Sequence, residues 1–268
     1  MAITPKLQQE LWKVASDLAD VAVRECLPFF RSEDLRASSK TAEGFDPVTM
    51  ADREAEKAMR AVLALRRPDD AILGEEFGTQ GGTTDLTWVL DPIDGTRAFI
   101  CGAPTWGILI GVDAGEGPIL GLIDQPHIGE RFIGGFGRAE VRRNGNARDI
   151  RTRPCTSLAD ATLFTTYPEV GSMTERTGFE AVRDRVKLTR YSLDCYAYAL
   201  IAMGQADLVI EAGLQAYDIQ GPQAVIEAAG GIVTNWTGGS AHEGGQIVAA
   251  GDPRVHAAAL DLLAPYAD

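Results

Sequence analysis

The chain is poor in the residues that mark several common classes of protein. Its 268 residues include only 4 cysteines and 3 histidines. The cysteines are scattered without a Cys-x-x-Cys pair, so the sequence predicts buried thiols in a reducing cytoplasm and neither a disulfide framework nor a zinc site. Because the histidines are few and dispersed, any metal that binds this chain should have oxygen ligands.

Basic residues are also scarce. The chain has 25 lysines and arginines against 38 aspartates and glutamates, which gives a net charge of −13. Nucleic acids and anionic membranes are bound by basic surfaces, and we expect neither as a partner. A small phosphorylated substrate is compatible with this charge, because bound divalent cations can reverse the local field.

Long apolar runs are missing as well. The first residues show no basic-then-apolar signal layout, and no run is long enough to span a bilayer, so we expect a cytoplasmic protein. A content of 45% hydrophobic and 24% charged residues is ordinary for a globular protein of this length. The chain can therefore bury a sizeable core.

The N-terminal region has the periodicity of two helices. Apolar residues at helical spacing predict a first helix over 5–31 that ends near Pro28. Asp46 followed by Pro47 is typical of a helix start, and we expect a second helix from there to Arg66.

Strand patterns follow these helices. A short apolar strand over 71–74 should lead into an exposed loop at 78–84, which is rich in glycine and threonine. The pattern is β-rich over 105–150, where the Asn-Gly pair at 144–145 indicates a hairpin. After this region, strands alternate with helices to the end of the chain.

This alternation predicts an α/β protein built as a layered sandwich. We expect a boundary near residue 150. The N-terminal α+β half, residues 1–150, would carry most of the candidate metal ligands. The C-terminal α/β half, residues 151–268, would carry the acids that face the substrate, together with Asp218.

The strongest chemical signal is the segment 88–96. Three apolar residues lead into Asp91 and Asp94, and Gly95 and Thr96 then open a helix. Paired acids at a strand end, beside a helix start with unpaired N–H groups, can hold hard cations and a phosphate in one place. A single strand-end acid is more often a turn former or a cap, but that interpretation does not explain the whole block.

Three further acids are candidates for the same place. Glu75 follows the strand over 71–74, which puts it at a strand end where open α/β sheets bind ligands. Asp52 lies about two turns into its predicted helix, and spacing alone leaves a solvated surface charge and a site residue about equally favoured. Asp218 lies near the start of a helix predicted over 218–229, and local evidence favours a helix cap.

Five segments in this order resemble the inositol monophosphatase family: 46–52, 74–76, 88–96, 217–218 and 227–231. The family is part of a wider group of lithium-sensitive, magnesium-dependent phosphatases that includes fructose bisphosphatases. The resemblance covers residues 40 to 251 and implies an alternating α-β-α-β-α sandwich. It also implies hydrolysis of phosphomonoesters.

The resemblance implies a set of metal ligands. Glu75, Asp91 and the carbonyl of Ile93 would hold one Mg²⁺, and Asp91, Asp94 and Asp218 would hold a second. Two or three ions per site are expected. On this basis the ligand role replaces the helix-cap interpretation of Asp218, and a catalytic neighbourhood is favoured for Asp52.

The resemblance also assigns the catalytic groups. Thr96, with Asp52 and Glu75 nearby, would orient the attacking water, and Gly95 and Thr96 would hold phosphate oxygens. Inhibition by Li⁺ and a homodimer are further implications of the resemblance.

The substrate is suggested by segments 94–99 and 190–198, which resemble the histidinol-phosphate phosphatase branch of the family. Histidinol phosphate carries an ammonium and an imidazole that can become cationic. We therefore predict that Asp194 and Glu211 meet these groups and that Arg190 also belongs to the substrate side. A competing interpretation, about equally favoured and compatible with the first, is that Asp194 caps a helix over 194–204.

Some features depart from the family pattern or oppose a ligand role. Tyr196 and Tyr198 are more typical of packing residues than of ligands. Pro222 is awkward inside a helix, so the regular helix is expected to begin later than the family pattern implies. The Ser-Leu pair at 192–193 replaces a pair that commonly contains glycine, and could alter the shape of the pocket.

The leading hypothesis is thus a histidinol-phosphate phosphatase of histidine biosynthesis. The first alternative is an inositol-1-phosphate phosphatase or a broader sugar-phosphate phosphatase. A remote alternative, from another functional class, is a binding or regulatory protein that keeps the fold without catalysis. The intact set of acids argues against that last alternative.

Overall fold

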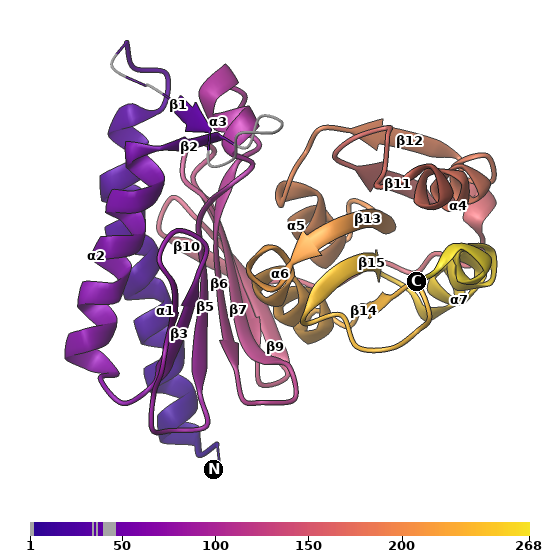
Figure 1. Cartoon of the computed structure of the whole chain (residues 1–268). Coiled ribbons are helices and arrows are strands. Elements are labelled where there is room, and N and C mark those ends of the chain that lie inside the picture. The colour runs from indigo at the N-terminus through magenta and orange to yellow at the C-terminus, as the bar shows by residue number, and fades with distance from the viewer. Residues whose placement is uncertain (1–2, 34, 36, 40–46) are drawn as a thin grey trace.

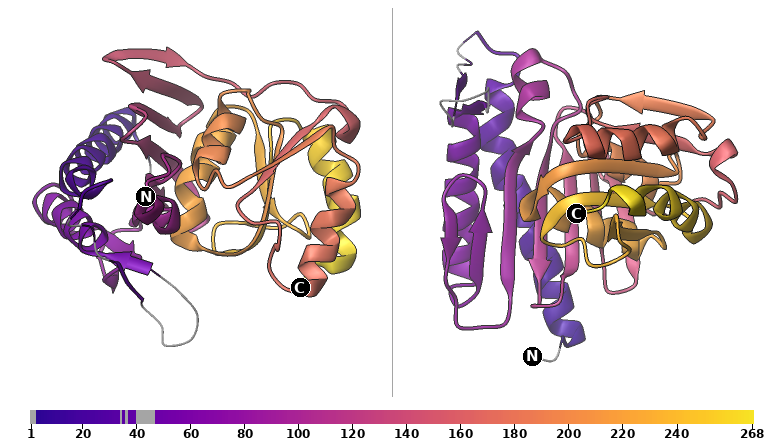
Figure 2. Two further views of the ribbon diagram at one scale, coloured as in Figure 1. Left: turned by 90° about the horizontal axis from the view of Figure 1, so that it is seen from above. Right: turned by 45° about the vertical axis from the view of Figure 1, so that its right-hand side comes forward.

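The computed structural model describes residues 3–33, 35, 37–39 and 47–268. Helices and sheets alternate in five layers (Figures 1 and 2). This is the α-β-α-β-α sandwich that the sequence predicts. From the N-terminal side, the helical layers are α1 (Pro5–Cys26) with α2 (Met50–Arg66), then α5 (Tyr196–Ala202) with α6 (Ala216–Ala228), then α4 (Met173–Arg183) with α7 (Pro253–Leu263).

Between the first two helical layers lies an eight-stranded sheet with the order β10-β9-β8-β7-β6-β5-β3-β4. Its strands are β3 (Ala71–Gly74), β4 (Gly78–Gln80), β5 (Thr87–Asp94), β6 (Gly107–Asp113), β7 (Pro118–Gln125), β8 (Glu130–Gly135), β9 (Arg138–Arg143) and β10 (Asn146–Asp149). All neighbours are antiparallel except β3 and β5, which run parallel. The hairpin predicted at 144–145 joins β9 to β10, whereas the loop predicted at 78–84 begins as strand β4.

The second sheet has five strands in the order β12-β11-β13-β15-β14. They are β11 (Thr162–Thr165), β12 (Leu188–Tyr191), β13 (Leu208–Gln215), β14 (Ile232–Asn235) and β15 (Gly244–Ala250). A small pair, β1 (Ala37–Ser39) with β2 (Pro47–Thr49), precedes α2, and the short helix α3 (Thr96–Cys101) follows β5. Residues of the middle helices pack against apolar side chains of both sheets.

The first helix ends near Pro28, as predicted, and so does not reach residue 31. Thr4 caps it and Pro5 occupies its first turn, and one face is buried through Leu11 and Leu18. The regular helix stops at Cys26, and residues 27–29 form a single 3₁₀ turn around Pro28, because proline cannot supply a further helical N–H. No helix in the described part of the chain is long and apolar enough to cross a membrane.

The second helix begins later than predicted. Asp46 lies outside the described residues, Pro47 belongs to β2, and α2 starts at Met50. Its cap is Thr49, whose backbone N–H and hydroxyl both donate to Asp52, at 2.8 and 2.5 Å. This capping box places Asp52 in the first turn of α2 and not two turns in.

A strip of glycines brings α6 close to the larger sheet. Gly121 on β7 is directly opposite Gly111 on β6 and Gly134 on β8. A Cβ atom on Gly121 would lie 2.0 Å from the carbonyl oxygen of Gly221 in α6. The absence of side chains therefore lets the backbone of α6 lie directly on the strands.

The helix that this strip supports begins at Ala216 and continues through Pro222 to Ala228. The predicted later start is therefore wrong. Proline removes only one backbone donor, and packing on the sheet together with the capping box at Gln215 and Asp218 keeps the first turn regular. Asp218 is fixed in this first turn.

We expect Gly121→Ala to lower the free energy of unfolding by about 1–3 kcal/mol, because the new methyl group would overlap α6. Urea unfolding measures the change. Gly81→Ala is the matched control, since a Cβ there meets no described atom within 4 Å and should change stability by less than about 0.5 kcal/mol. Equal effects of the two substitutions would contradict close packing of α6 on the sheet.

Candidate active site

The acids of segment 88–96 and Glu75 meet at one edge of the larger sheet. Because β3 and β5 are parallel neighbours, their ends lie side by side, and the N–H of Glu75 donates to the carbonyl of Leu90 at 3.1 Å. The pairing of β5 with β6 is irregular between Asp91 and Asp94. Oδ1 of Asp91 accepts a hydrogen bond from the N–H of Ile93 at 3.0 Å, which fixes this turn.

Asp218 joins this edge from the first turn of α6. One carboxylate oxygen from each of Asp91, Asp94 and Asp218 lies within 4.8 Å of the other two. Burial raises the pKa of Asp91 well above its usual range, and the charges of Glu75 and Asp94 raise it further. The pKa of Asp94 is likewise raised, by burial and then by Asp194 and Asp218. Such a cluster of oxygens is stabilised by a divalent cation, and its donor set fits a metal such as magnesium.

Each aspartate of the cluster also bonds to the backbone of the protein. Oδ2 of Asp218 accepts from the N–H of Gln215 at 2.7 Å, so this acid is a helix cap and a member of the cluster at once. Oδ2 of Asp94 accepts from the N–H of Cys195 at 2.7 Å. These bonds aim the carboxylates before any cation binds.

Asp52 is buried and is not a solvated surface charge. Its Oδ2 serves the capping box with Thr49, whereas Oδ1 is buried without a hydrogen-bond partner among the described residues. Burial raises the pKa of Asp52 to about 6, and the charges of Glu76 and Glu75 contribute to the rise. Asp52 is therefore within electrostatic reach of Glu75, and its catalytic role stays a prediction.

Gly95 and Thr96 lie where β5 turns into α3. Gly95 has a φ of 77°, in the left-handed region that favours glycine, and a Cβ there would lie 2.9 Å from Cγ of Asp194. The hydroxyl of Thr96 donates to the carbonyl of Ile93 at 3.2 Å. Gly95 therefore lies next to Asp194, which is predicted to face the substrate. Thr96 lies next to the carbonyl of Ile93, between Asp91 and Asp94 in sequence.

A cavity of about 200 Å³ lies beside the cluster. It is lined by Asp94, Thr166, Tyr167, Asp194, Cys195, Tyr198, Glu211, Ala212, Leu214 and Asp218. Four of these ten residues are acids: Asp94 and Asp218 belong to the cluster, whereas Asp194 and Glu211 do not and make the cavity suited to a cationic group. We call it the acidic cavity.

Glu211 lies on β13 at the inner wall of the acidic cavity. Its Oε1 accepts from the N–H and the hydroxyl of Thr166, at 2.7 and 2.9 Å, and its Oε2 accepts from the hydroxyl of Thr165 at 3.2 Å. Burial nevertheless raises the pKa of Glu211 to about 7. A cation bound in the cavity would lower this pKa again and favour the ionised carboxylate.

Asp194 lines the cavity and does not cap a helix. α5 begins at Tyr196, with Cys195 in the cap position, so the predicted helix over 194–204 is shorter at its start. Oδ2 of Asp194 instead accepts from the hydroxyl of Thr105 at 2.7 Å. The backbone of Asp194 has a φ of 46°, in the left-handed region, and its side chain lines the cavity.

Arg190 is not brought to the acidic cavity. It lies on β12, the edge strand of the smaller sheet, and its side chain is exposed. It is not among the described residues that line the cavity. Its predicted contact with substrate stays a prediction.

Glu56 is a site residue that the sequence reasoning missed. It is fully buried on α2, and its Oε2 accepts from the N–H of Glu76 at 2.7 Å, while Oε1 accepts from Phe77 at 3.3 Å and from Arg60 at 2.7 Å. These bonds hold the turn that follows Glu75. Its spacing from Asp52 could have indicated it, because Glu56 is four residues after Asp52 and so lies on the same face of the helix.

Tyr198, which the sequence analysis favours as a packing residue, is buried and also lines the cavity. Its hydroxyl has no hydrogen-bond partner among the described residues. Tyr196 is a structural residue, since its hydroxyl donates to Glu130 at 2.9 Å. Thr105, Thr166 and Tyr167 were missed, because no local motif in the sequence marks them as members of a site.

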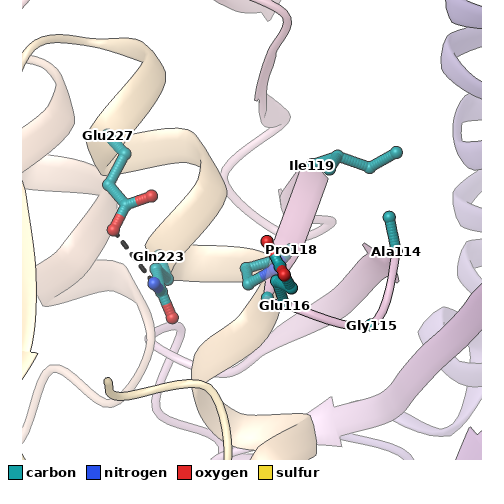
Figure 3. Close-up of a pocket in the computed structure, with 8 residues that line it drawn as sticks. Ala114, Gly115, Glu116, Pro118, Ile119, Gln223 and Glu227 are labelled. Carbon is teal, nitrogen blue, oxygen red and sulfur yellow. Dashed lines mark hydrogen bonds between the residues drawn. The ribbon is translucent and has the colours of Figure 1, made fainter. Parts of the chain in front are cut away.

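A second cavity, of about 490 Å³, lies between the β6–β7 turn and the later part of α6 (Figure 3). Its acids are Glu116 and Glu227, and Glu227 accepts a hydrogen bond from Gln223 at 2.9 Å. None of the clustered acids at the end of β5 lines it. Although larger, this cavity lacks the grouping of carboxylates that distinguishes the acidic cavity.

A family model, known proteins and solved structures all match this chain. The family model for the inositol monophosphatase family matches residues 7–267. The chain is 42% identical over 261 residues to the bifunctional phosphatase IMPL2, chloroplastic, of Arabidopsis thaliana, a match that covers 93% of this chain and 74% of the relative.

Two further proteins that are similar to this chain are named for different activities. A histidinol-phosphatase of Streptomyces coelicolor is 32% identical over 260 residues, which is 94% of this chain and 96% of the relative. The solved structure of an inositol monophosphatase from Zymomonas mobilis aligns with a TM-score of 0.84 at 37% identity, covering 97% of this chain and 99% of that one.

The raised pKa of Glu211 predicts a pH-dependent stability. Between its ordinary pKa of 4.5 and about 7, the folded protein holds this proton more tightly than the unfolded chain does. The free energy of unfolding should therefore fall as the pH rises through this range, by roughly 3 kcal/mol at most from this group. Glu211→Gln should make that slope shallower.

Urea unfolding of both proteins from pH 4.5 to 8, with a chelator present, measures the two slopes. Other buried acids contribute equally to both proteins, so the difference isolates Glu211. Identical slopes would contradict the burial of an ionisable carboxylate at this position.

Proposed function

This chain belongs to the inositol monophosphatase family of phosphatases, and we propose that it is a magnesium-dependent phosphomonoesterase whose main substrate is histidinol phosphate. The observation that carries the choice of substrate is the acidic cavity directly beside the cluster of Asp91, Asp94 and Asp218. Phosphate chemistry requires the cluster. A cationic leaving group would be favoured by the cavity.

The two metal positions implied by the resemblance are part of this proposal. Glu75, Asp91 and the carbonyl of Ile93 would hold one magnesium ion, and Asp91, Asp94 and Asp218 a second. When bound, the ions would neutralise the carboxylates, polarise the phosphate and acidify a water. Glu56 positions the first set, because it holds the turn that carries Glu75.

The chain's own residues would position the reacting groups. Thr96 and Gly95 would donate to phosphate oxygens from the start of α3. Asp52, with one unpartnered buried oxygen and a pKa of about 6, is suited to accept a proton from the water that attacks phosphorus. The hydroxyl of Thr96 would orient that water.

The leaving group would lie in the acidic cavity. Asp194 and Glu211 both line it, and the ammonium or imidazolium of histidinol phosphate can pair with either carboxylate. Inositol is neutral and would gain hydrogen bonds but no ion pair. The name of the Streptomyces coelicolor relative supports this choice.

Inositol-1-phosphate, or a wider range of sugar phosphates, is the second candidate substrate. The solved Zymomonas mobilis structure, named as an inositol monophosphatase, covers almost the whole chain and supports this alternative. The homodimer and the inhibition by lithium implied by the resemblance are part of the proposal and follow from no contact described above.

Phosphate release with magnesium, measured in parallel on histidinol phosphate and inositol-1-phosphate, tests the choice of substrate. We expect a higher kcat/KM for histidinol phosphate. Equal or better turnover of the inositol ester would overturn it, and no turnover of any monoester would favour a non-catalytic protein.

Asp194→Asn should lower kcat/KM for histidinol phosphate by roughly 10- to 100-fold, because a charge-assisted hydrogen bond is lost. Asparagine tolerates the left-handed backbone at this position, so the fold should be kept. The effect on inositol-1-phosphate should be smaller. A similar loss on both esters would show that Asp194 acts structurally.

Asp91→Asn should lower kcat/KM on every ester by more than about a hundredfold, since this carboxylate is shared by both proposed metal positions. Titration with magnesium, followed by the rise in thermal unfolding temperature, gives a readout that does not depend on turnover. Wild-type protein should gain stability with magnesium and the variant much less. Near-normal rates and stabilisation would refute the metal assignment.

A further inference from the structure

Tyr167 is one of two tyrosines in the wall of the acidic cavity. It follows β11, lines the acidic cavity together with Asp194 and Glu211, and is 43% exposed. Part of its surface is therefore open to a ligand.

The side chain of Tyr167 is contacted by Arg97 of α3. The guanidinium of Arg97 donates to its hydroxyl at 2.9 Å, and the guanidinium carbon lies 5.5 Å from the ring centroid. Arg97 directly follows Thr96 in α3. This contact joins α3, on the phosphate side, to the loop after β11.

The loop that carries Tyr167 is also tied to Glu211. The N–H of Thr166, the residue before it, donates to Glu211, and the hydroxyl of Thr165 lies 3.5 Å from the carbonyl oxygen of Tyr167. The ring and the carboxylate therefore keep a defined relation to each other. An aromatic face beside a buried carboxylate is an arrangement that suits a flat cation.

We propose that Tyr167, held in place by Arg97, is a specificity-determining residue whose ring stacks on a planar, cationic leaving group in the acidic cavity. The inference rests on the proposed function and deepens it. The carboxylates would attract any cation, whereas the ring would distinguish an aromatic cation, such as an imidazolium, from an aliphatic ammonium. A neutral polyol would gain from neither.

Three esters separate these contributions: histidinol phosphate, an aliphatic amino-alcohol phosphate, and inositol-1-phosphate. In Tyr167→Leu, the ratio of kcat/KM for histidinol phosphate to that for the amino-alcohol ester should fall by roughly two- to tenfold, the range of an aromatic stacking contact, which an aliphatic ammonium cannot make. Tyr167→Phe keeps the ring and should recover most of this ratio. Tyr191→Leu is the matched control, because Tyr191 is similarly exposed, at 37%, and does not line the cavity among the described residues.

Binding can be followed without turnover of the aromatic ester. Histidinol should inhibit hydrolysis of the amino-alcohol ester, and its inhibition constant should rise in Tyr167→Leu by the same factor. Arg97→Gln should raise it less, since the ring remains but is held less firmly.

The outcomes distinguish a failure of the proposed substrate from a failure of the stacking role of Tyr167. If the wild-type protein does not hydrolyse histidinol phosphate, the proposed function fails and this inference fails with it. If it does, but Tyr167→Leu lowers kcat/KM for all three esters alike, only the stacking role is overturned. If Arg97→Gln depresses all three esters alike, Arg97 contacts the phosphate instead, and the proposed holding of the ring is wrong.

Discussion

The mutual repulsion of carboxylates at the end of β5 is the constraint on which the rest of the site depends. Asp91, Asp94 and Asp218 place oxygens within 4.8 Å of one another, in a partly buried position. Burial and mutual charge raise the pKa values of Asp91 and Asp94, so the site favours either protons or cations. A fold that holds such a cluster must supply strong local restraints.

Those restraints come largely from backbone hydrogen bonds. Asp52 and Asp218 occupy equivalent places in the capping boxes of α2 and α6, helices that pack on opposite faces of the larger sheet. Each uses one oxygen to complete its own helix start. Glu56 holds the turn after Glu75 in a similar way, through two backbone N–H groups. Asp52 and Asp218 thus cap their helices, and the same hydrogen bonds fix the orientation of their carboxylates.

Several features of the site were predictable because they depend on short stretches of sequence. Asp91 and Glu75 follow adjacent apolar strands, and the ends of parallel strands meet at one sheet edge. The position of Asp52 within its helix was not predictable in this way. The helix is capped by Thr49, whereas the sequence pattern indicated a start at Pro47. The role of Asp194 was also open, since its partner Thr105 is distant in sequence. Nothing local distinguished Arg190, on an exposed edge strand, from a residue of the cavity.

By itself, the sequence determined the alternation of helices and strands, the family and the identity of the acids, because periodicity, turn residues and ordered motifs are local properties of the chain. Only the tertiary structure decided which of these acids share one site and what surrounds them. Asp218 reaches Asp91 because glycines opposite one another on neighbouring strands let α6 lie on the sheet. Tyr167 enters the cavity because the loop after β11 comes to Arg97, and contacts over such separations in sequence exist only once the layers have packed.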